Sequence, residues 1–435
     1  MTAQAGVPGR AHDTALTQQR GDHSPGPISA DGHASTLLDR LCGERDAAGR
    51  DALLARAVWS RLAEPGDAVA GAVTALLGPV QSLTALVGPQ PARTLASALR
   101  AAGAESASAG SRQLRAAITR WGLRLDRALT MRDLETAATA GMTLLTPECA
   151  GWPAQLLDLG DHAPHALWVR GNSRPLASPA LAVVGARACT GYGSHATAEL
   201  TGEACAAGFT IVSGAAYGVD AVAHRTALAA EAPTVAILAG GADRPYPASH
   251  DQLLTRVAEQ GAVCSELVPG SAPTRWRFLQ RNRIIAALSR AVLVTEAGVR
   301  SGTLNTAGHG AEMGRPIGAV PGPITSAASV GCHRLVREYG ATLVTNGAEL
   351  LELLGVQPLD LLGDDRRGDG EAPLGDGADD AARADGADGG TGAAGGGTAG
   401  RGTAGGAPQA DTAPGDDGER FHALIALAFC LCQQI

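Results

Sequence analysis

Short apolar runs alternate with longer amphipathic stretches over the second half of the chain. From about residue 175 to residue 355, the apolar runs have strand length, and stretches of helix length separate most of them. The runs are Leu181–Val184, Phe209–Val212, Thr234–Leu238, Ala262–Cys264, Ala291–Val294, Pro316–Val320 and Thr342–Val344. Continuous apolar strands that alternate with helices are typical of a mostly parallel sheet covered on both faces. We therefore predict an α/β domain with a Rossmann-like, mostly parallel sheet over residues 175–355.

The chain before residue 175 has a different pattern. Residues 1–35 are polar and rich in Gly, Pro and His, which predicts a disordered arm. Residues 36–174 repeat apolar positions at helical spacing, with breaks at Pro65-Gly66 and Gly88-Pro89. This pattern predicts a small all-helical domain, closed by a short strand at Leu167–Val169.

The charge of the chain is unevenly distributed. A formal net charge of −8 is unfavourable for a protein that binds nucleic acid. Residues 356–420, however, hold 14 acidic residues and 5 arginines, a net −9 that leaves +1 for the remaining chain. We predict that this Gly-, Ala- and Asp-rich tract is a flexible linker, so that a nucleic-acid site elsewhere needs only a local basic patch.

Hydropathy and cysteine spacing exclude several other classes. No apolar run reaches the ~20 residues of a membrane span, and the N-terminus has no apolar signal core. We therefore expect a cytoplasmic protein with no membrane partner. The eight cysteines include no C-x-x-C pair and no His at ligand spacing, which argues against a zinc site and a disulfide framework. We expect no metal.

Loops that follow the predicted strands carry small and hydroxyl residues. The candidates for ligand binding in these loops are Gly185, Arg187, Ser213, Gly214, Ser301, Gly302 and Thr303. Ligands of such sheets bind at the carboxyl ends of the strands, where glycine lets a phosphate approach the backbone and helix starts favour anions. For any single loop, the alternative that glycine merely permits a tight turn stays open. Several such loops on one edge favour phosphate binding.

Two familiar nucleotide motifs are absent. Gly185 is followed by Ala-Arg-Ala, which does not continue as G-x-G-x-x-G, and the second strand ends in Val212-Ser213 without an acidic residue. Dinucleotide binding is therefore improbable, and no G-x-x-x-x-G-K-[ST] motif supports ATPase chemistry. We expect no cofactor.

The strongest basic segment spans residues 267–295 and contains no acidic residue. Its cations are Arg275, Arg277, Arg281, Arg283 and Arg290, with Trp276 and Phe278 between the first of them. Guanidinium groups bind phosphates, and a ring can stack on an unpaired base. We predict DNA contacts from Arg275, Arg277, Phe278, Arg281 and Asn282. The alternative that Trp276 and Phe278 anchor the core stays open.

The sequence gives little support for catalysis. Asp220 and His224 lie four residues apart on one predicted helix, and Glu296 follows a strand. Asp220 is explained if it caps the start of its own helix, and His224 is explained as a hydrogen-bonded packing residue. No carboxylate pairs with Glu296 in the sequence, and no G-x-S-x-G motif occurs. We predict that the protein is not an enzyme.

Taken in order, these residues resemble the DNA-processing protein A (DprA/Smf) family. The resemblance is carried by Val184–Arg187, Ser213–Asp220 with His224, Asp243 with Tyr246-Pro247, Phe278–Ile285, Glu296 with Ser301–Leu304, and Ala319–Gly322. It covers about residues 175–354, and the helical stretch before them is similar with weaker motifs. The chain departs from the family at Ala186, Ala215 and Leu279, where Ser or Thr, Leu and Pro are usual.

The resemblance implies a non-catalytic protein that binds single-stranded DNA and forms homodimers. It also implies a role in protecting incoming DNA and loading the RecA recombinase during DNA uptake and transformation. Arg187 is then the phosphate contact of the first loop, with Ser213, Gly214, Ser301 and Gly302 in the same pocket. Many relatives carry a C-terminal winged helix, and residues 421–435 are interpreted as a truncated remnant of it.

Two other functions remain open on the sequence. One is an enzyme of a related Rossmann-like group that cleaves nucleotide N-glycosidic bonds, although its Pro-Gly-Gly-x-Gly-Thr-x-x-Glu motif is absent. The other is a nucleotide-sensing module that uses the same pocket for one small ligand. The basic and aromatic segment at residues 275–283 favours a polymeric ligand over a small one.

Overall fold

The computed structural model describes residues 29–103 and 111–356. The predicted acidic linker and C-terminal remnant therefore lie outside the described residues, as does most of the predicted N-terminal arm. Within that predicted arm, a helix already begins at Gly32, because the carboxylate of Asp31 accepts a hydrogen bond from the backbone N–H of Ala34. The described residues belong to one compact unit.

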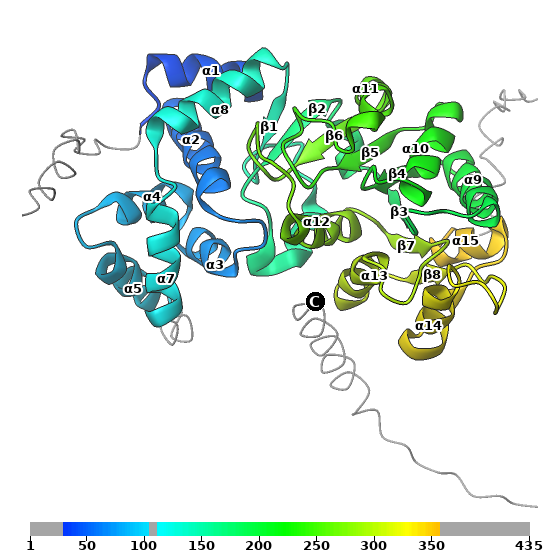
Figure 1. Cartoon of the computed structure of the whole chain (residues 1–435). Coiled ribbons are helices and arrows are strands. Elements are labelled where there is room, and N and C mark those ends of the chain that lie inside the picture. The colour runs from blue at the N-terminus through cyan, green and yellow to red at the C-terminus, as the bar shows by residue number, and fades with distance from the viewer. Residues whose placement is uncertain (1–28, 104–110, 357–435) are drawn as a thin grey trace, which may run out of the picture. The chain divides into compact units, whose positions relative to one another are not determined.

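The N-terminal third is helical, as predicted, and forms the blue-to-cyan part of Figure 1. Its helices are α1 (Gly32–Cys42), α2 (Ala47–Leu62), α3 (Ala68–Leu77), α4 (Pro79–Val87), α5 (Pro91–Ala101), α7 (Ser111–Gly122) and α8 (Arg127–Thr139). Aspartates cap several helix starts, and prolines stand at the starts of α4 and α5, where a missing N–H costs nothing. Trp59 and Trp121 pack edge to face in the core of this part, with ring centroids 5.1 Å apart.

A nine-stranded, mostly parallel sheet follows and confirms the predicted fold class. Its strands are β1 (Thr143–Leu145), β2 (Leu167–Gly171), β3 (Ala180–Val184), β4 (Thr210–Ser213), β5 (Thr234–Ile237), β6 (Ala262–Ser265), β7 (Ala291–Val294), β8 (Ile317–Ala319) and β9 (Thr342–Leu343). Their order is β1-β2-β6-β5-β4-β3-β7-β8-β9, and only the pairings made by β2 are antiparallel. Strands β1 and β2 lie before residue 175, so the sheet extends into the stretch predicted to be mainly helical. Strand β2 contains the short strand predicted at Leu167–Val169, whereas β1 was not predicted.

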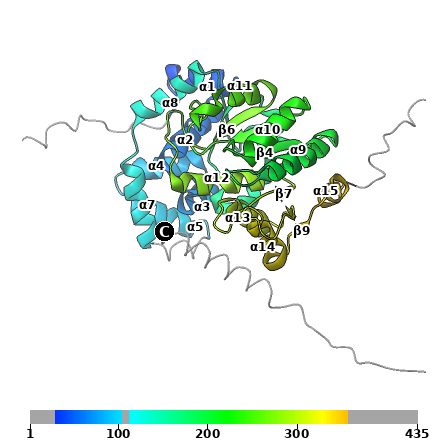
Figure 2. The ribbon, with the colours of Figure 1, turned by 45° about the vertical axis from the view of Figure 1, so that its right-hand side comes forward.

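Helices cover both faces of the sheet (Figure 2). They are α9 (Gly191–Ala206), α10 (Val219–Ala229), α11 (Asp251–Gln260), α12 (Arg275–Ala287), α13 (Thr303–Glu312), α14 (Val330–Tyr339) and α15 (Gly347–Leu353), with 3-10 segments η1 (Ala154–His162), η2 (Arg174–Ala177) and η3 (Ala248–His250). Leu181 and Val183 pack with residues of α9 and α10, whereas Ala182 and Val184 pack with residues of α12 to α14. This alternation buries β3 on both faces, as its continuous apolar sequence predicts.

Strand order reverses at β3, and this reversal positions the site. From β3 the chain builds β4, β5 and β6 on one side and returns to add β7, β8 and β9 on the other. Loops therefore diverge at the carboxyl ends of β3 and β7 and leave a crevice there, which is where such sheets bind ligands. Among the described residues, no single helix is long and apolar enough to cross a membrane, and the bent pair α3–α4 passes that test only when joined.

Candidate nucleic-acid interface

A groove of about 840 Å³ opens at the carboxyl edge of the sheet. Its walls come from the loops after β3 and β7 and from α12, and a few residues that follow β4 and β5 also line it. The predicted site residues that line it are Gly185, Arg187, Arg275, Phe278, Arg281, Asn282, Ser301, Gly302 and Thr303. The fold thus brings most of the predicted site together, from segments at residues 185–187, 275–282 and 301–303.

The loop after β3 is fixed by its backbone, which leaves the side chain of Arg187 available. A Cβ atom at Gly185 would lie 2.5 Å from the side chain of Val219, so glycine is required for this close approach. The N–H of Ala186 donates to the carbonyl of Glu296 at 2.8 Å. Arg187 is exposed, and its guanidinium carbon lies 5.2 Å from the ring centroid of Phe278.

The side chain of Glu296 anchors the start of α9. Its two carboxylate oxygens accept hydrogen bonds from the backbone N–H of Thr190, at 2.9 Å, and from the hydroxyl of Thr190, at 2.5 Å. Thr190 is in turn the N-cap of α9. Glu296 is buried and lies outside the residues that line the groove. This arrangement explains the residue as a structural anchor and gives no support to the acid/base role considered from the sequence.

Helix α12 presents a cation and a ring to the groove. The helix begins after Thr274, whose hydroxyl accepts a hydrogen bond from the N–H of Arg277. Arg275 is exposed, and Phe278 is half-buried with its ring centroid 5.4 Å from that of Tyr246. Both α12 residues line the groove, so guanidinium and aromatic groups lie together there. Phe278 is therefore accessible, and it does not anchor the core.

Arg281 lies at the groove but is held by the protein itself. Only 7% of the residue is exposed, and its guanidinium donates to the carbonyl oxygens of Gly214, at 2.9 Å, and Ile237. Burial lowers the pKa of Arg281 to about 10, although the charge of Asp220 opposes that shift. Since these carbonyls belong to the ends of β4 and β5, Arg281 ties both strands to α12. Its predicted phosphate contact is thus replaced, in this structure, by a structural role.

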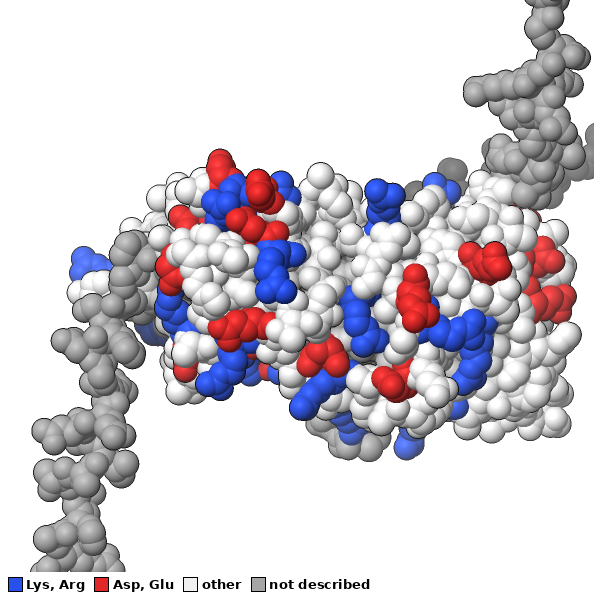
Figure 3. Space-filling model, turned by 90° about the horizontal axis from the view of Figure 1, so that it is seen from above, with Lys and Arg blue, Asp and Glu red and all other residues white. Residues whose placement is uncertain are grey.

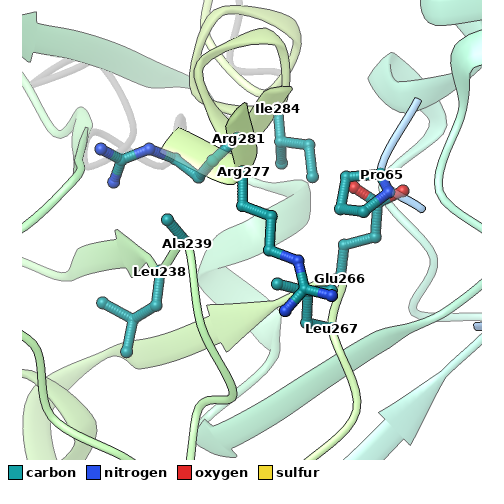
Figure 4. Close-up of a pocket in the computed structure, with 8 residues that line it drawn as sticks. All are labelled: Pro65, Leu238, Ala239, Glu266, Leu267, Arg277, Arg281 and Ile284. Carbon is teal, nitrogen blue, oxygen red and sulfur yellow. The ribbon is translucent and has the colours of Figure 1, made fainter. Parts of the chain in front are cut away.

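Arg277 lies outside the groove, and its guanidinium points toward Glu266 and Leu267, on the opposite side from the guanidinium of Arg281 (Figure 4). Its guanidinium donates to the two carboxylate oxygens of Glu64, at 3.1 and 3.0 Å, and to the carbonyl of Ala272 at 2.8 Å. Together with Pro65, it borders a small cavity of about 10 Å³ on the far side of α12. One helical turn therefore directs Arg275 and Phe278 to the groove and Arg277 to the helical part of the chain.

Ser213 and Gly214 also lie outside the groove, contrary to the expectation that they line it. The hydroxyl of Ser213 is fully buried and donates to the carbonyl of Val183 at 2.7 Å, which joins β4 to β3. Gly214 is required because a Cβ atom there would lie 2.1 Å from the guanidinium of Arg281. These two residues serve strand pairing and close packing instead.

Asp220 and His224 are both structural, although Asp220 does not cap its own helix. Its carboxylate accepts from the N–H groups of Gly214, at 3.2 Å, and Ala216, at 3.3 Å, in the loop before α10. Burial raises the pKa of Asp220, with Arg281 opposing the shift. His224 is buried against Thr234, with Nδ1 2.7 Å from the threonine hydroxyl, and burial lowers its pKa to about 3. His224 is therefore the packing residue that the sequence favoured.

The loop after β7 forms the remaining wall. The hydroxyl of Ser301 accepts from the N–H of Thr303 at 3.2 Å, and the amide of Asn282 donates to the carbonyl of Gly302 at 3.3 Å. Gly302 is exposed at the start of α13, where the helix dipole favours an anion, and the N–H groups of residues 303–305 already donate to oxygens of residues 301 and 302. Asn282 is thus a link between two walls of the groove.

Arg300 and Tyr246 also line the groove, although they were not among the predicted contacts. Arg300 is exposed in the loop after β7, and Tyr246 follows β5. Arg300 could have been predicted from the sequence, because it directly precedes Ser301-Gly302 and so places a cation beside a candidate phosphate loop. Trp276, in contrast, is exposed and lies outside the groove, so it is neither a core anchor nor part of this wall. Among the described residues, no group of three or more His, Cys, Asp or Glu side chains could hold a metal ion.

Comparisons of the sequence with known proteins identify the family of this chain. The family model described as DNA recombination-mediator protein A matches residues 143–355. A protein named DprA from Mycobacterium tuberculosis is 41% identical over 312 residues, which cover 69% of this chain and 74% of that protein.

Solved structures of DprA proteins also align with the chain. The X-ray structure of DNA processing protein A from Streptococcus pneumoniae aligns with a TM-score of 0.51 and 31% identity, covering 62% of this chain and 92% of that one. The Helicobacter pylori DNA processing protein A, whose structure was described for its single-stranded DNA binding mode, covers 49% of this chain and 95% of that one. Its TM-score is 0.45, at 28% identity.

Proposed function

Because the chain belongs to the DNA recombination-mediator protein A family, we propose that its groove binds single-stranded DNA. The exposed guanidinium groups of Arg187, Arg275 and Arg300 contact phosphates, and the ring of Phe278 stacks on a base. The start of α13 accepts a further phosphate at Gly302 and Thr303. No chemical step follows binding, and the bound strand is handed to another protein.

The observation that carries this proposal is the pairing of exposed cations with an accessible ring in one groove. Arg187 lies 5.2 Å from the ring centroid of Phe278, close enough for one nucleotide to contact both side chains. Four arginines line the groove, whereas Asp220 is its one carboxylate among the described lining residues. That carboxylate is buried and already accepts two backbone hydrogen bonds. The potential of the groove is therefore positive, as a phosphodiester chain requires.

The charge distribution on one face of the molecule fits a local site. On the face of the molecule seen in Figure 3, acidic and basic side chains are interspersed, so this face has no continuous basic tract. The mixed charge of that face fits the near-neutral net charge of the chain before the acidic tail. Strand binding then depends on the few arginines of the groove, and each of them is expected to matter.

The alternative of an N-glycosidic-bond-cleaving enzyme has weaker support. Such chemistry needs a carboxylate that can reach a nucleotide in the groove. Glu296 is bound to Thr190 outside the lining residues, and Asp220 is occupied by the backbone of residues 214–216. We therefore favour binding over cleavage. A nucleotide-sensing module would bind one small ligand in the same groove and would not need the flanking arginines.

The wider role is proposed from the family resemblance. We propose that the protein acts as a homodimer in the cytoplasm, protects incoming single strands and helps load RecA onto them during DNA uptake. The motifs of the loops after β3 and β7, which carry the resemblance, are those that line the groove. This is the reason to connect the groove with the recombination-mediator role.

The test is binding of a fluorescent oligo-dT of about 20 nucleotides, measured by anisotropy across a salt series. We expect log Kd to rise with log salt, and Arg187→Ala to weaken binding and reduce the slope by roughly one phosphate contact. Arg256→Ala is the matched control, because Arg256 is an exposed arginine of α11 outside the groove. Absence of binding at low salt, or equal losses in both variants, would overturn the proposal.

A further inference from the structure

Three of the four tyrosines of this aromatic-poor chain follow strands of the sheet at its carboxyl edge. Tyr192 follows β3, Tyr217 follows β4 and Tyr246 follows β5. Their exposed fractions are 46, 50 and 47%, respectively. Only 3% of the residues are aromatic, so half-exposed rings gathered at one edge need an explanation.

Tyr192 is explained by its own contacts. Its hydroxyl donates to the carbonyl of Pro321 at 2.5 Å, and its ring borders Gly322. It therefore holds the loop between β8 and α14. Tyr217 and Tyr246 have no comparable role. Among the described residues, the hydroxyl of Tyr217 bonds only the exposed hydroxyl of Ser249, and the hydroxyl of Tyr246 has no polar partner.

The loops that carry these two tyrosines lie beside the loop of Arg187, along the same edge of the sheet. Strands β5, β4 and β3 are neighbours in the sheet, so the loops of Tyr246, Tyr217 and Arg187 follow one another along its edge. Contacts join adjacent loops: the N–H of Val219 donates to the carbonyl of Ala186, and the hydroxyl of Tyr217 lies 2.7 Å from that of Ser249. At about 4.8 Å between strands, the three loops span about 10 Å of edge.

Both rings are held in place before any ligand binds. The ring of Tyr217 packs edge to face on that of His250, with centroids 4.8 Å apart, and His250 is fixed by a 3.0 Å contact to the carbonyl of Ala215. The ring of Tyr246 lies 5.4 Å from Phe278 at an angle of 57°. Rings fixed in this way lose little conformational entropy when a base stacks on them.

We propose that Tyr217 and Tyr246 form a base-stacking track that extends the groove along the ends of β4 and β5. The ligand is the unpaired bases of the strand whose phosphates contact Arg187, so this inference rests on the proposed function. Stacking on a ring is possible for every base but not for a paired one in a duplex. The track therefore favours single strands over duplexes without selecting a sequence.

The experiment compares oligo-dT with a backbone of equal length that lacks bases. Tyr246→Ala and Tyr217→Ala are expected to weaken binding of oligo-dT about 5- to 100-fold, the range of a lost stacking contact, and to leave binding of the abasic strand unchanged. Tyr246→Phe and Tyr217→Phe keep the ring and are expected to bind both strands as the unaltered protein does. Leu157→Ala, at an exposed residue of η1, is the control for loss of exposed apolar surface.

Each outcome separates this inference from the proposed function. If the unaltered protein binds no oligo-dT, the proposed function fails and the track fails with it. If the unaltered protein binds and the alanine variants bind equally well, the groove stands and the track is wrong. Equal losses on the abasic strand would also overturn it, because they would show that the variants disturb the loops rather than base stacking.

Discussion

The carboxylate of Glu64, in the turn after α2, accepts two hydrogen bonds from the guanidinium of Arg277 on α12. Arg124 from the end of α7 donates to the same carboxylate. Burial by itself would raise the pKa of Glu64, but these two arginines outweigh it and hold the pKa below its ordinary value. The back of α12 is thus fixed to the helical part of the chain while its front carries Arg275 and Phe278 into the groove.

A double-mutant cycle tests this ion pair. We expect Glu64→Gln and Arg277→Gln each to lower the free energy of unfolding, with a coupling of about 0.5–1 kcal/mol because the pair is only half-buried. Urea unfolding of the two single variants and the double variant measures the coupling. A strictly additive pair, with DNA affinity lost only in Arg277→Gln, would show that Arg277 contacts DNA instead.

Replacement of Arg281 is expected to damage the fold more than replacement of Arg187. Arg281→Ala leaves the carbonyls of Gly214 and Ile237 unpaired and removes the charge that faces Asp220, at a cost of about 3 kcal/mol or more. Arg187 is exposed, so Arg187→Ala should change stability by less than about 0.5 kcal/mol. Thermal or urea unfolding of both variants checks this order, and equal stability of the two would contradict the structural role of Arg281.

Stability should fall as the pH drops below about 6.5. Burial lowers the pKa of His165 and of His224 to about 3, whereas the unfolded chain binds these protons near pH 6.5. The unfolded state then holds more protons below that pH, and each histidine costs up to about 1.4 kcal/mol of unfolding free energy per pH unit. Urea unfolding at pH 7.5, 6.5 and 5.5 measures the slope.

Two variants show how much of the pH dependence of the unfolding free energy comes from His224. His224→Gln is expected to reduce it by about half, and His195→Gln, at an exposed position, should leave it unchanged. A flat profile of the unaltered protein between pH 6.5 and 5.5 would show that these histidines are not buried in neutral form.

Glu296 provides a test of binding against catalysis. Glu296→Gln keeps one acceptor oxygen for Thr190, whereas Glu296→Ala removes both hydrogen bonds and loosens the start of α9 beside the Arg187 loop. We expect oligo-dT affinity to change less than about threefold in the first variant and more in the second. Hydrolysis of a nucleotide by the unaltered protein that disappears in Glu296→Gln would instead favour the glycosidic-bond-cleaving alternative.

The sequence was sufficient to predict the sheet because the strands are continuous apolar runs. Leu181–Val184 and the six similar runs after it all coincide with strands. Strand β2 was predicted as a short strand but not as part of the sheet, because it pairs antiparallel with β6 about a hundred positions later. Strand β1, which pairs with β2, was not predicted. The sheet therefore takes two of its nine strands from the chain before residue 175.

The sequence predicted which segments form the site, but it did not predict the direction in which each side chain points. Arg275, Arg277 and Arg281 occupy one helix and look equivalent in the sequence, yet they point to the groove, to Glu64 and to the ends of β4 and β5. Their partners come from distant segments, so no local pattern distinguishes them. The partner of Ser213 is also distant in sequence, because its hydroxyl donates to the carbonyl of Val183 in β3.

The most direct test of the groove is hydrogen exchange of the protein with and without oligo-dT. Bound DNA should slow amide exchange at residues 185–191, 298–303 and the first turn of α12, because these segments form the walls. Exchange in α5, which lies in the helical part, should not change. Protection confined to other segments, with the three walls unaffected, would contradict the assignment of the groove as the DNA site.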